Sequence, residues 1–491
     1  MVEPGARAHF RIARLGAVGV LVSQVCVALN APTRHIQHIE NNLLPAAFVA
    51  GEKPETETLA GAMRRLGVTG VSIAFIHRGR LEWTDQIGVT RLGGPPVDAR
   101  TVFQAASISK PVTAVAVMTL VQQGKLDLDR DVNTYLRLWK VPDGPDTAVE
   151  RVTVRRLLSH TAGISVHGFS GYAAGEAVPS LIQVLNGERP ANSAPVRVEN
   201  VPGTGWSYSG GGYEIVQQLL TEFTGTSFAK LMDERVLAPA AMRRSSFEQP
   251  IAVALRANAA TPHDSEGQPI AGGAHTYPEQ AAAGLWTTPS DLARLVINLQ
   301  GSLAGRGDGI VFPAIAHEML RPVGKSAWGL GFGVGGTNDG HPYFIHEAGN
   351  AGFRDLLVAF ADGDAIVVMT NGDQGDVITA ALLRTAAVEY DWPEFQPRQH
   401  QLVQLPTAAL ERLVGEYQFT PETTITITRR VGRLLLRFQG QEAGEILADG
   451  PASFFSTTRD LRVRFHVDGA GRATGMSLER GGATFEAPRM P

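Results

Sequence analysis

The segment QAASISKP (residues 104–111) leads directly into the apolar run VTAVAVMTLV (112–121). This pattern predicts a turn that feeds a buried helix, with Ser107 at the N-cap and Gly124 just beyond the C-terminal end. Because the run is apolar nearly all round, we expect other parts of the chain to cover the helix on every side. Burying Ser107 and Lys110 at the mouth of such a helix is costly unless both side chains face a cleft.

Ser107 and Lys110 also form a chemically useful pair. A spacing of three residues places them on one face of the helix, where the lysine amine can accept the proton of the serine hydroxyl. The N-terminus of the helix favours negative charge that develops beside it. Because Ser-x-x-Lys is a short pattern, an N-cap serine beside a solvated lysine is the alternative, and the rest of the chain has to decide between the two interpretations.

The composition is that of an ordinary globular protein. The chain has 491 residues, of which 44% are hydrophobic and 19% are charged, so it can form more than one domain with a sizeable core. Its net charge of -4 gives no electrostatic reason to expect a nucleic acid as partner. The single cysteine, Cys26, excludes an internal disulfide and any multi-cysteine metal site.

The N-terminal residues 1–31 have features of an export leader. Three arginines precede an apolar run over 15–29 that is too short for a comfortable transmembrane span. This predicts a periplasmic or secreted protein with no strong membrane anchor beyond the leader. The poor cleavage signal before Pro32 leaves an amphipathic N-terminal helix or a misassigned start codon as alternatives, and then a cytoplasmic protein. The following segment 32–56 carries no periodic signal, and we expect it to be mobile.

Strand and helix patterns predict one α/β domain over residues 57–392. A hairpin over 70–89 precedes the buried helix, and two further strands over 353–360 and 365–370 follow it. One sheet should therefore join hairpins that are distant in the sequence, with helices between them. A closing helix is expected over 377–390.

The composition changes at residues 393–406, a proline-containing segment that we interpret as a linker. Beyond it, residues 407–491 read as a small all-β domain of the sandwich or barrel type, without a catalytic cluster. Its expected strands cover 424–428, 433–438, 453–456, 462–467 and 476–479.

The region between the buried helix and the later strands contains a histidine and a tyrosine that could take part in catalysis. His160 lies where a short helix stops, and we favour a histidine that bonds the backbone there over a catalytic base. Tyr208 stands in a glycine-rich loop before a helix, where glycines allow a close approach of backbone and ligand. The long segment 165–200 is expected to form a cleft wall, with His167 and Tyr172 among its contact-capable residues.

In combination, these stretches resemble the serine β-lactamase family, in the branch that holds class C β-lactamases, D-peptidases and related esterases. The resemblance runs from about residue 68 to residue 390. Several motifs agree in order, and their joint occurrence is far more specific than any one of them: FQAASISK (103–110), GKLDL (124–128), LLSHTAG (157–163), YS (208–209) and HEAGNAGF (346–353).

The resemblance implies a fold and a set of roles. The fold would be an antiparallel sheet flanked by helices, with a helical subdomain. Ser107 would be the nucleophile and Lys110 its base, while Tyr208 would share the proton and activate the deacylating water. The N–H groups of Ser107 and Gly349 would form the oxyanion hole, and His346 would begin the third motif. The family chemistry needs no metal and no organic cofactor.

Two of the three family motifs are incomplete in this chain. The second, Tyr-x-Asn, ends in Gly210, and the third has Glu347 where the family has a hydroxyl. We list as possible substrate contacts Gly210, Glu347, Arg354 and Tyr172. Without the Asn amide, we expect small neutral esters, amides or peptides to be better substrates than β-lactams.

Other functions stay open at this point. A true β-lactamase or an enzyme that acts like a D-alanyl-D-alanine carboxypeptidase uses the same residues. A non-catalytic sensor would keep Ser107 and Lys110, become acylated once and fail to turn over. An interaction scaffold would use only the C-terminal β-domain. The sequence does not fix the oligomeric state.

Overall fold

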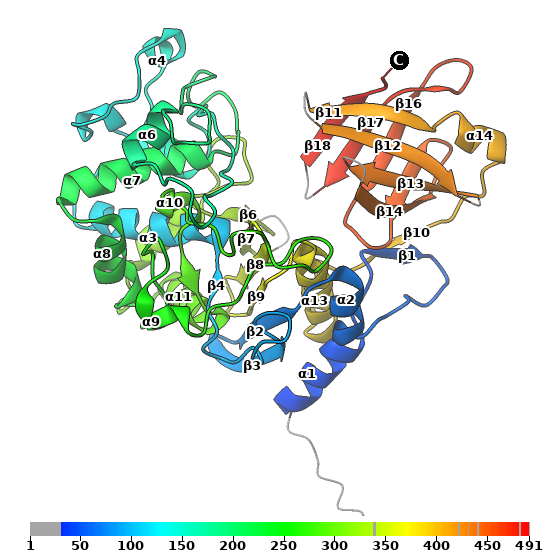
Figure 1. Ribbon diagram of the computed structural model, residues 1–491, viewed down its shortest axis with the longest axis horizontal. Helices are drawn as coiled ribbons and strands as arrows, with labels where there is room; N and C mark the ends of the chain where they lie inside the picture. The colour runs from blue at the N-terminus through cyan, green and yellow to red at the C-terminus, as the bar shows by residue number, and fades with distance from the viewer. Residues whose placement is uncertain are drawn as a thin grey trace, which may run out of the picture.

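The computed structural model describes residues 31–336, 340–420, 423–430, 432–438, 441–480 and 483–490. The predicted leader lies outside these residues except for its last position. A six-stranded sheet, a group of helices around it and a separate all-β domain make up the described chain (Figure 1).

The six-stranded sheet is antiparallel throughout and has the strand order β3-β2-β9-β8-β7-β6. The first hairpin pairs with β9, which lies almost 300 positions further along the chain, so the sheet joins sequence-distant hairpins as predicted. The strands are β2 (Gly70–His77), β3 (Arg80–Gly88), β6 (Gly333–Gly335), β7 (Tyr343–Asn350), β8 (Phe353–Phe360) and β9 (Ala365–Thr370).

Both faces of this sheet are covered. On β2, Val71, Ile73 and Phe75 belong to one hydrophobic cluster, and Ala74 and Ile76 belong to the other. Successive side chains of a strand point to opposite faces, so a strand buried on both sides reads as a continuous apolar run. That is the reason why GVSIAFIH contains so few polar residues.

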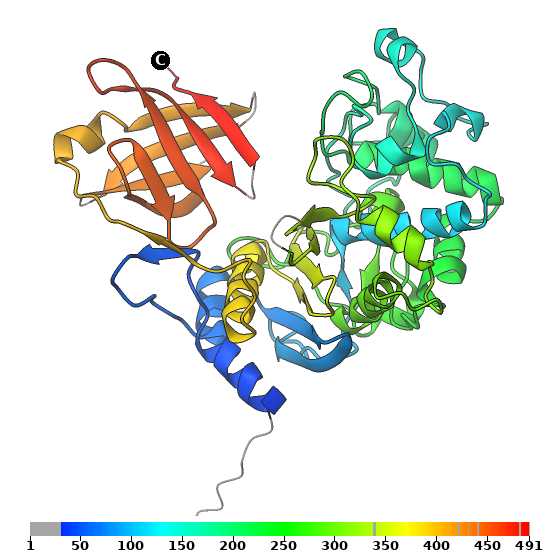
Figure 2. The same cartoon turned by 180° about the vertical axis from the view of Figure 1, so that it is seen from behind.

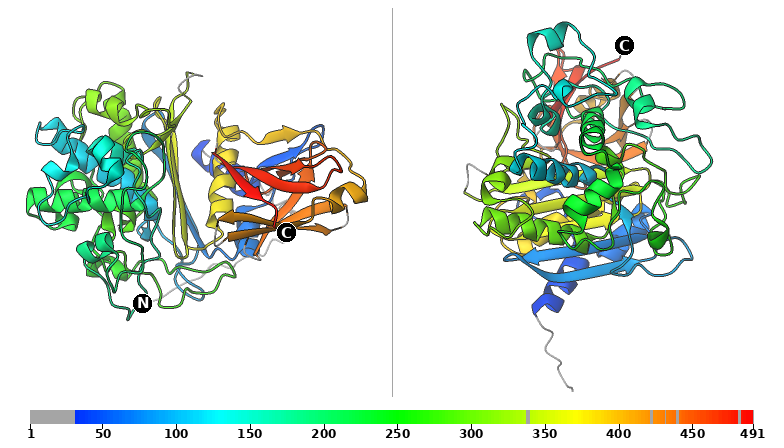
Figure 3. Two further views of the ribbon diagram at one scale, coloured as in Figure 1. Left: turned by 90° about the horizontal axis from the view of Figure 1, so that it is seen from above. Right: turned by 90° about the vertical axis from the view of Figure 1, so that its left-hand side faces the viewer.

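Helices occupy the two faces of the sheet, and Figure 3 shows them in separate layers on either side of it. On one side α13 (Gly375–Glu389) packs on β8 and β9, together with α2 (Leu59–Leu66). On the other side α11 (Pro289–Leu303) packs on β2 and β9. On the same side as α11 lie nine further helices of the described part of the hydrolase domain (Figure 1): α3 (Ser109–Gln122), α4 (Pro145–Val149), α5 (Val154–Leu158), α6 (Leu181–Asn186), α7 (Gly210–Thr224), α8 (Phe228–Met232), α9 (Val253–Arg256), α10 (Gln280–Ala283) and α12 (Pro313–Met319).

Helix α3 is the buried helix that the sequence predicts. Its residues from Ser109 to Leu120 are all buried, and its polar positions are Ser109, Lys110, Thr113 and Thr119. Because apolar side chains occur all round it, the helix has no polar face to turn to solvent. It runs through the interior of the helical layer and carries Lys110 in its first turn.

The segment 32–56 differs from its prediction. It forms α1 (Ala31–Asn41), which packs on α13, and β1 (Ala47–Val49), which pairs in parallel with β10 (Arg398–His400). The interactions that order it come from elements more than 300 residues away, so no local periodicity could reveal them. Strand β10 lies inside the segment predicted as a linker.

The C-terminal part is an eight-stranded antiparallel sheet in which every strand pairs with the next, β11 to β18 (Figure 2). A bridge between Tyr417 and Arg489 and the bond from Met490 N to Glu416 O (2.8 Å) bring its first and last strands together. The domain is therefore a barrel rather than a sandwich, with a side-chain core of its own. Its elements are α14 (Thr407–Glu411), β11 (Gly415–Thr420), β12 (Thr423–Arg430), β13 (Arg433–Phe438), β14 (Gln441–Ala448), β15 (Ser453–Ser456), β16 (Arg462–Val467), β17 (Ala473–Arg480) and β18 (Ala483–Pro488).

The five strands expected in this domain correspond to β12, β13, β15, β16 and β17. Strands β11, β14 and β18 were not anticipated. Within the part of the chain that the structure describes, no helix has the length and apolar character needed to cross a membrane.

Candidate active site

Ser107 lies in a short 3-10 turn, Ala106–Ile108, immediately before α3. The strand β4 (Phe103–Gln104) fixes its approach by pairing with β5 (Trp286–Thr287), and Ala105 N donates to Leu285 O at 2.8 Å. The prediction of Ser107 as an N-cap is wrong, because its side chain caps no backbone N–H. The positive φ of Ala106 (43°) bends the backbone so that the serine belongs to the turn and not to the helix end.

The Lys110 amine lies beside the Ser107 hydroxyl. Lys110 Nζ is 3.0 Å from Ser107 Oγ and donates a second bond of 3.0 Å to the carbonyl of Ala282 on α10. Lys110 is 2% exposed, whereas Ser107 is half-buried. Among the described residues, no carboxylate forms an ion pair with Lys110, so the amine is held by two neutral oxygen atoms.

Tyr208 brings its ring to the same amine, with Lys110 Nζ 4.9 Å from the ring centroid. It is held in the loop that enters α7. Ser209, the N-cap of α7, accepts from Gly212 N at 2.9 Å and donates to Ser165 O at 2.7 Å, and His167 bonds the Tyr208 carbonyl. The structure therefore brings together Ser107, Lys110 and Tyr208 as the sequence predicts.

His160 also holds this loop in place through hydrogen bonds. Its Nδ1 accepts from Ser209 N at 3.1 Å and its own carbonyl accepts from Ser207 N at 2.9 Å. Burial, and after it the positive charge of Lys110, hold the pKa of His160 well below its usual range, so the ring is neutral. Its centroid lies 4.3 Å from that of Tyr208. The favoured interpretation of His160, a histidine that bonds the backbone, is confirmed.

The third motif lies on β7, whose side chains alternate between the two faces of the sheet. His346, Ala348 and Asn350 face the helical layer that contains α3, while Glu347 has an exposed side chain on the opposite face. Asn350 Nδ2 donates to Gln104 Oε1 at 2.9 Å, which ties the end of β7 to the segment that carries Ser107.

The register of the β7–β8 hairpin sets the direction of the Gly349 N–H. Asn350 and Phe353 close a two-residue turn, and such a closing pair is hydrogen-bonded, so the N–H of the preceding residue points away from β8. The pairing of β6 with β7 extends only from Tyr343 to Ile345, and the 3-10 turn that holds Ser107 packs against β7. Gly349 therefore presents its N–H at the edge of β7 that β6 leaves uncovered.

His346 is neutral as well. Burial, with Lys110 as the second cause, lowers its pKa from 6.5 to about 3. Its Nδ1 bonds the carbonyl of Glu347 at 2.7 Å, which requires the proton on Nδ1 and leaves Nε2 as an acceptor. In the described structure Nε2 is buried without a partner. His346 thus cannot supply the positive charge that a lysine gives in this motif.

Two predicted substrate contacts are used by the fold itself. Tyr172 is 2% exposed, and its hydroxyl accepts from Asn192 N at 3.1 Å, so it anchors the long loop. Arg354 pairs with Asp373 (2.7 Å) and donates to the carbonyl of Asn350 (2.6 Å), so its guanidinium holds the hairpin. The buried Tyr172 side chain is not available to a substrate, and that prediction is corrected. The Arg354 guanidinium is already paired within the fold, with 30% of its side chain exposed.

Gly210 cannot act as a substrate contact either. It is buried at the start of α7, and its N–H donates to His167 O at 3.1 Å. A Cβ at this position would lie 2.9 Å from Cε2 of Phe169. The ring of Phe169 thus occupies the space beside position 210, where the family has its asparagine side chain.

Sequence reasoning missed two buried acids, Glu214 near Lys110 and Glu279 near Glu214. Glu214 on α7 accepts from Ala282 N at 3.2 Å, on the peptide whose carbonyl accepts from Lys110. Burial, and then the neighbouring Glu279, raise the pKa of Glu214 well above its usual range. Burial raises the pKa of Glu279 from 4.5 to about 7. A charged residue inside the apolar helix 214–220 was the available signal for Glu214.

Two tryptophans were also missed. Trp206, 44% exposed, and Trp328 have centroids 5.5 Å apart, and both lie within 6.4 Å of the Tyr208 ring. Their packing fixes the exposed side of Tyr208. They come from two loops, and no pattern in either loop marks them.

The described residues contain no group of three or more His, Cys, Asp or Glu side chains that could hold a metal ion. A family model described as Beta-lactamase matches residues 56–389, which is more than half of the chain. The chain belongs to the beta-lactamase family. It is therefore a serine hydrolase of this family. A second family model, described as a domain of unknown function (DUF3471), matches residues 399–488 and so covers the barrel strands.

Individual relatives agree with this assignment. A penicillin-binding protein of Bacillus subtilis (strain 168) is 22% identical over 430 residues, which cover 80% of this chain and 89% of that protein. The esterase EstB of Burkholderia gladioli is 29% identical over 219 residues, 43% of this chain and about half (54%) of the esterase. The structure of the octameric penicillin-binding protein homologue from Pyrococcus abyssi shares the fold, with a TM-score of 0.59, 20% identity, and coverage of 87% of this chain and 98% of that one.

The buried acid Glu279 gives a prediction on pH. In the folded chain this carboxyl keeps its proton up to a pKa of about 7, whereas the unfolded chain releases it near 4.5, so the wild type loses stability as the pH rises through that window. Glu279→Gln stays neutral at every pH. The variant should unfold like the wild type at about pH 5 and be more stable by about 3 kcal/mol at about pH 8. Urea unfolding at the two pH values measures this, with the exposed Glu248→Gln as control; an equal difference at both pH values would contradict it.

Proposed function

We propose that the protein hydrolyses small esters, amides or peptides through an acyl-enzyme on Ser107. The contact of 3.0 Å between Lys110 Nζ and Ser107 Oγ, in a site where the amine is buried, is the observation that carries this proposal. An alkyl hydroxyl is a weak nucleophile near neutral pH and needs an adjacent base. The alternative of a solvated lysine beside an N-cap serine does not agree with this burial.

In the proposed reaction, the Lys110 amine accepts the Ser107 proton as Oγ bonds to the substrate carbonyl carbon. The bond from this carbon to the leaving group then breaks, and the leaving oxygen or nitrogen takes a proton from the Tyr208 phenol. A water molecule then gives a proton to the Tyr208 phenolate as its oxygen bonds to the acyl carbon. The bond from this carbon to Ser107 Oγ breaks, and Oγ takes its proton back from Lys110. The N–H groups of Ser107 and Gly349 would stabilise the oxyanion, and one such donor is worth about 3–4 kcal/mol.

The buried acid Glu214 lies near Lys110 without forming an ion pair with it at the distances that the described structure shows. A carboxylate beside Lys110 would stabilise the ammonium form, which cannot accept a proton. The raised pKa of Glu214 keeps this acid protonated, and its hydrogen bond holds the Ala282 peptide in place. Glu214 therefore positions the lysine without giving it a counter-charge.

The proposed preference for esters and amides follows from the charges around Ser107. A penicillin or cephalosporin carries a carboxylate that needs a cation or a hydroxyl near the third motif. Here His346 is neutral because its pKa is about 3, and Arg354 is bound to Asp373. The side chain of Glu347 lies on the other face of β7. A neutral substrate needs no cation near the third motif. The carboxylate of a β-lactam has no free cation to bind among His346, Glu347 and Arg354.

The nucleophile can be tested by covalent labelling. Ser107→Ala should lose all labelling by a fluorophosphonate, measured as the mass increase of the intact protein. Ser109→Ala is the control, because Ser109 Oγ only accepts the backbone N–H of Leu285 (3.0 Å) inside the core. It should keep the label even if its melting temperature falls. Labelling of the Ser107→Ala variant would overturn the assignment.

The role of Tyr208 can be separated from that of Tyr213. Tyr208→Phe should lower kcat/KM for p-nitrophenyl butyrate by at least about a hundredfold, the usual worth of a positioned base. Tyr213→Phe should leave it within a few-fold, because the Tyr213 hydroxyl is fully buried and donates to Leu158 O (3.0 Å). If Tyr208→Phe kept most of the activity, the second motif would be misassigned.

The substrate preference can be tested with a matched pair of β-lactams. Short-chain p-nitrophenyl esters should exceed cephalosporins in kcat/KM by at least about tenfold. The methyl ester of benzylpenicillin, which lacks the free carboxylate, should undergo ring opening at least as fast as benzylpenicillin. Faster opening of the free acid would show that the carboxylate is recognised. Stoichiometric labelling by the esters without release of further product would instead indicate a sensor.

A further inference from the structure

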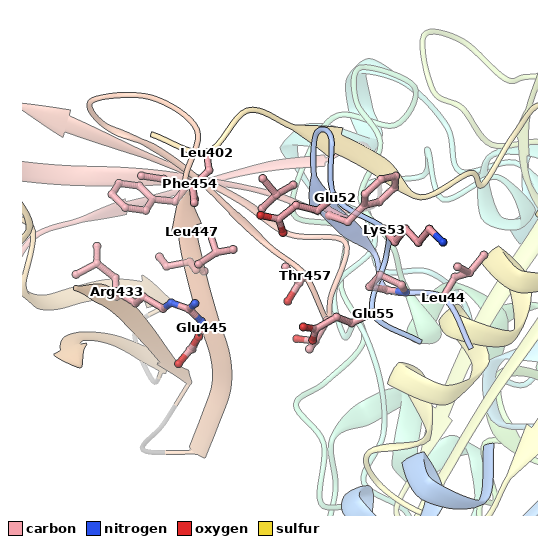
Figure 4. Close-up of a pocket in the computed structure, with 18 of the residues that line it drawn as sticks. Leu44, Glu52, Lys53, Glu55, Leu402, Arg433, Glu445, Leu447, Phe454 and Thr457 are labelled. Carbon is pink, nitrogen blue, oxygen red and sulfur yellow. Dashed lines mark hydrogen bonds and ion pairs between the residues drawn. The ribbon is translucent and has the colours of Figure 1, made fainter. Parts of the chain in front are cut away.

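A cavity that contains none of the residues Ser107, Lys110 and Tyr208 in its wall lies between the hydrolase domain and the barrel. It is a cavity of about 720 Å³, and Figure 4 shows side chains from both domains around it. One wall is the chain segment 43–57, and a second is a single face of α13, with Val377, Ala381 and Arg384 spaced as residues on one helical stripe. The barrel strands β13, β14 and β15 supply the third.

Arg384 is an unusual residue in this wall. It is only 7% exposed, and its Nε donates to Leu44 O at 3.3 Å. Within the described chain no carboxylate lies at ion-pair distance from it, and Asp460, which acts on it from further away, pairs with Arg398 (3.5 Å). Burial lowers the pKa of Arg384 to about 10. A guanidinium has five N–H donors, so most of those on Arg384 remain for a molecule in the cavity.

A buried charge without a close partner is unfavourable, and Arg384 is such a charge. The other two arginines of the cavity do not share this state, because Arg433 pairs with Glu445 (2.5 Å) and Arg65 pairs with Glu57. Lys53 also lines the cavity, but it is exposed to solvent. Among the described residues of the wall, Arg384 is thus the buried cation without a counter-charge at ion-pair distance. An oxygen anion that accepts two parallel N–H bonds would match its planar fork.

The other residues that line the cavity indicate the chemical nature of the molecule that carries the anion. Leu44, Leu447 and Leu402 line the space, and Leu402 is 39% exposed although it is apolar. Glu52 and Glu55 stand exposed in the wall as well, and they disfavour a ligand with several negative charges. The complementary molecule has one negative charge and an apolar body.

We propose that this cavity binds a monocarboxylate with an apolar body, whose carboxylate pairs with Arg384 and whose hydrocarbon part contacts Leu44, Leu402 and Leu447. The site does not depend on Ser107. Because the ligand touches both domains, its binding stabilises their association. The carboxylate can belong to a lipid-like acid or to the C-terminus of a short peptide, since both offer the same chemistry to Arg384.

The test uses the full chain with Ser107→Ala, so that no turnover contributes to the signal. Isothermal titration with decanoate and with N-acetyl-leucyl-leucine should show saturable binding of at least one of them, and the stronger of the two identifies the source. Decan-1-ol, which lacks the charge, should bind at least about tenfold more weakly than decanoate, as expected when a charge-assisted pair is lost.

Two variants locate the site. Arg384→Met replaces the buried charge by an apolar side chain of similar length, so the fold should persist and the binding should fall by at least about tenfold. Leu402→Asp changes a partly exposed position, and it should weaken binding by charge repulsion without affecting the fold. Arg433→Gln is the matched control and should bind as before. No binding of either acid, or equal binding by the Arg384→Met chain, would overturn the proposal.

Discussion

The site depends on the way in which Lys110 is held in the first turn of a fully buried helix. Its amine reaches two oxygen atoms only, the hydroxyl of Ser107 and the carbonyl of Ala282. The carbonyl is fixed because the same peptide bonds Glu214 through its N–H. This amine is buried, and the ring of Tyr208 lies 4.9 Å from it.

A common electrostatic pattern follows from that arrangement. Burial shifts the titratable groups near Lys110 towards their neutral forms, because it lowers the pKa values of His160 and His346 and raises that of Glu214. The side chains around Lys110 therefore interact with it as hydrogen-bonding groups rather than as counter-charges. The neutral His346 separates this site from the lysine-containing version of the third motif.

The sequence predicts well whatever depends on local pattern or on motifs in order. The buried helix, the hairpin over 70–89 and the trio of Ser107, Lys110 and Tyr208 are of this kind. It fails where a partner distant in the chain decides the outcome. Phe169 fills the space beside Gly210, Asp373 occupies Arg354, and β10 orders the segment 32–56. In each case the side chain or strand has no unusual feature in the sequence, and only the fold shows which neighbour it contacts.

Because β1 pairs in parallel with β10, the amino-terminal region forms part of the surface that contacts the barrel. Ala46 N also bonds Thr457 O (2.7 Å), so the segment before the hydrolase domain reaches the loop after β15. A recombinant chain trimmed to begin at residue 56, where the family match starts, would leave β10 with an open edge and Leu402 beside a gap. Self-association of trimmed protein would then reflect the missing strand and not the native surface.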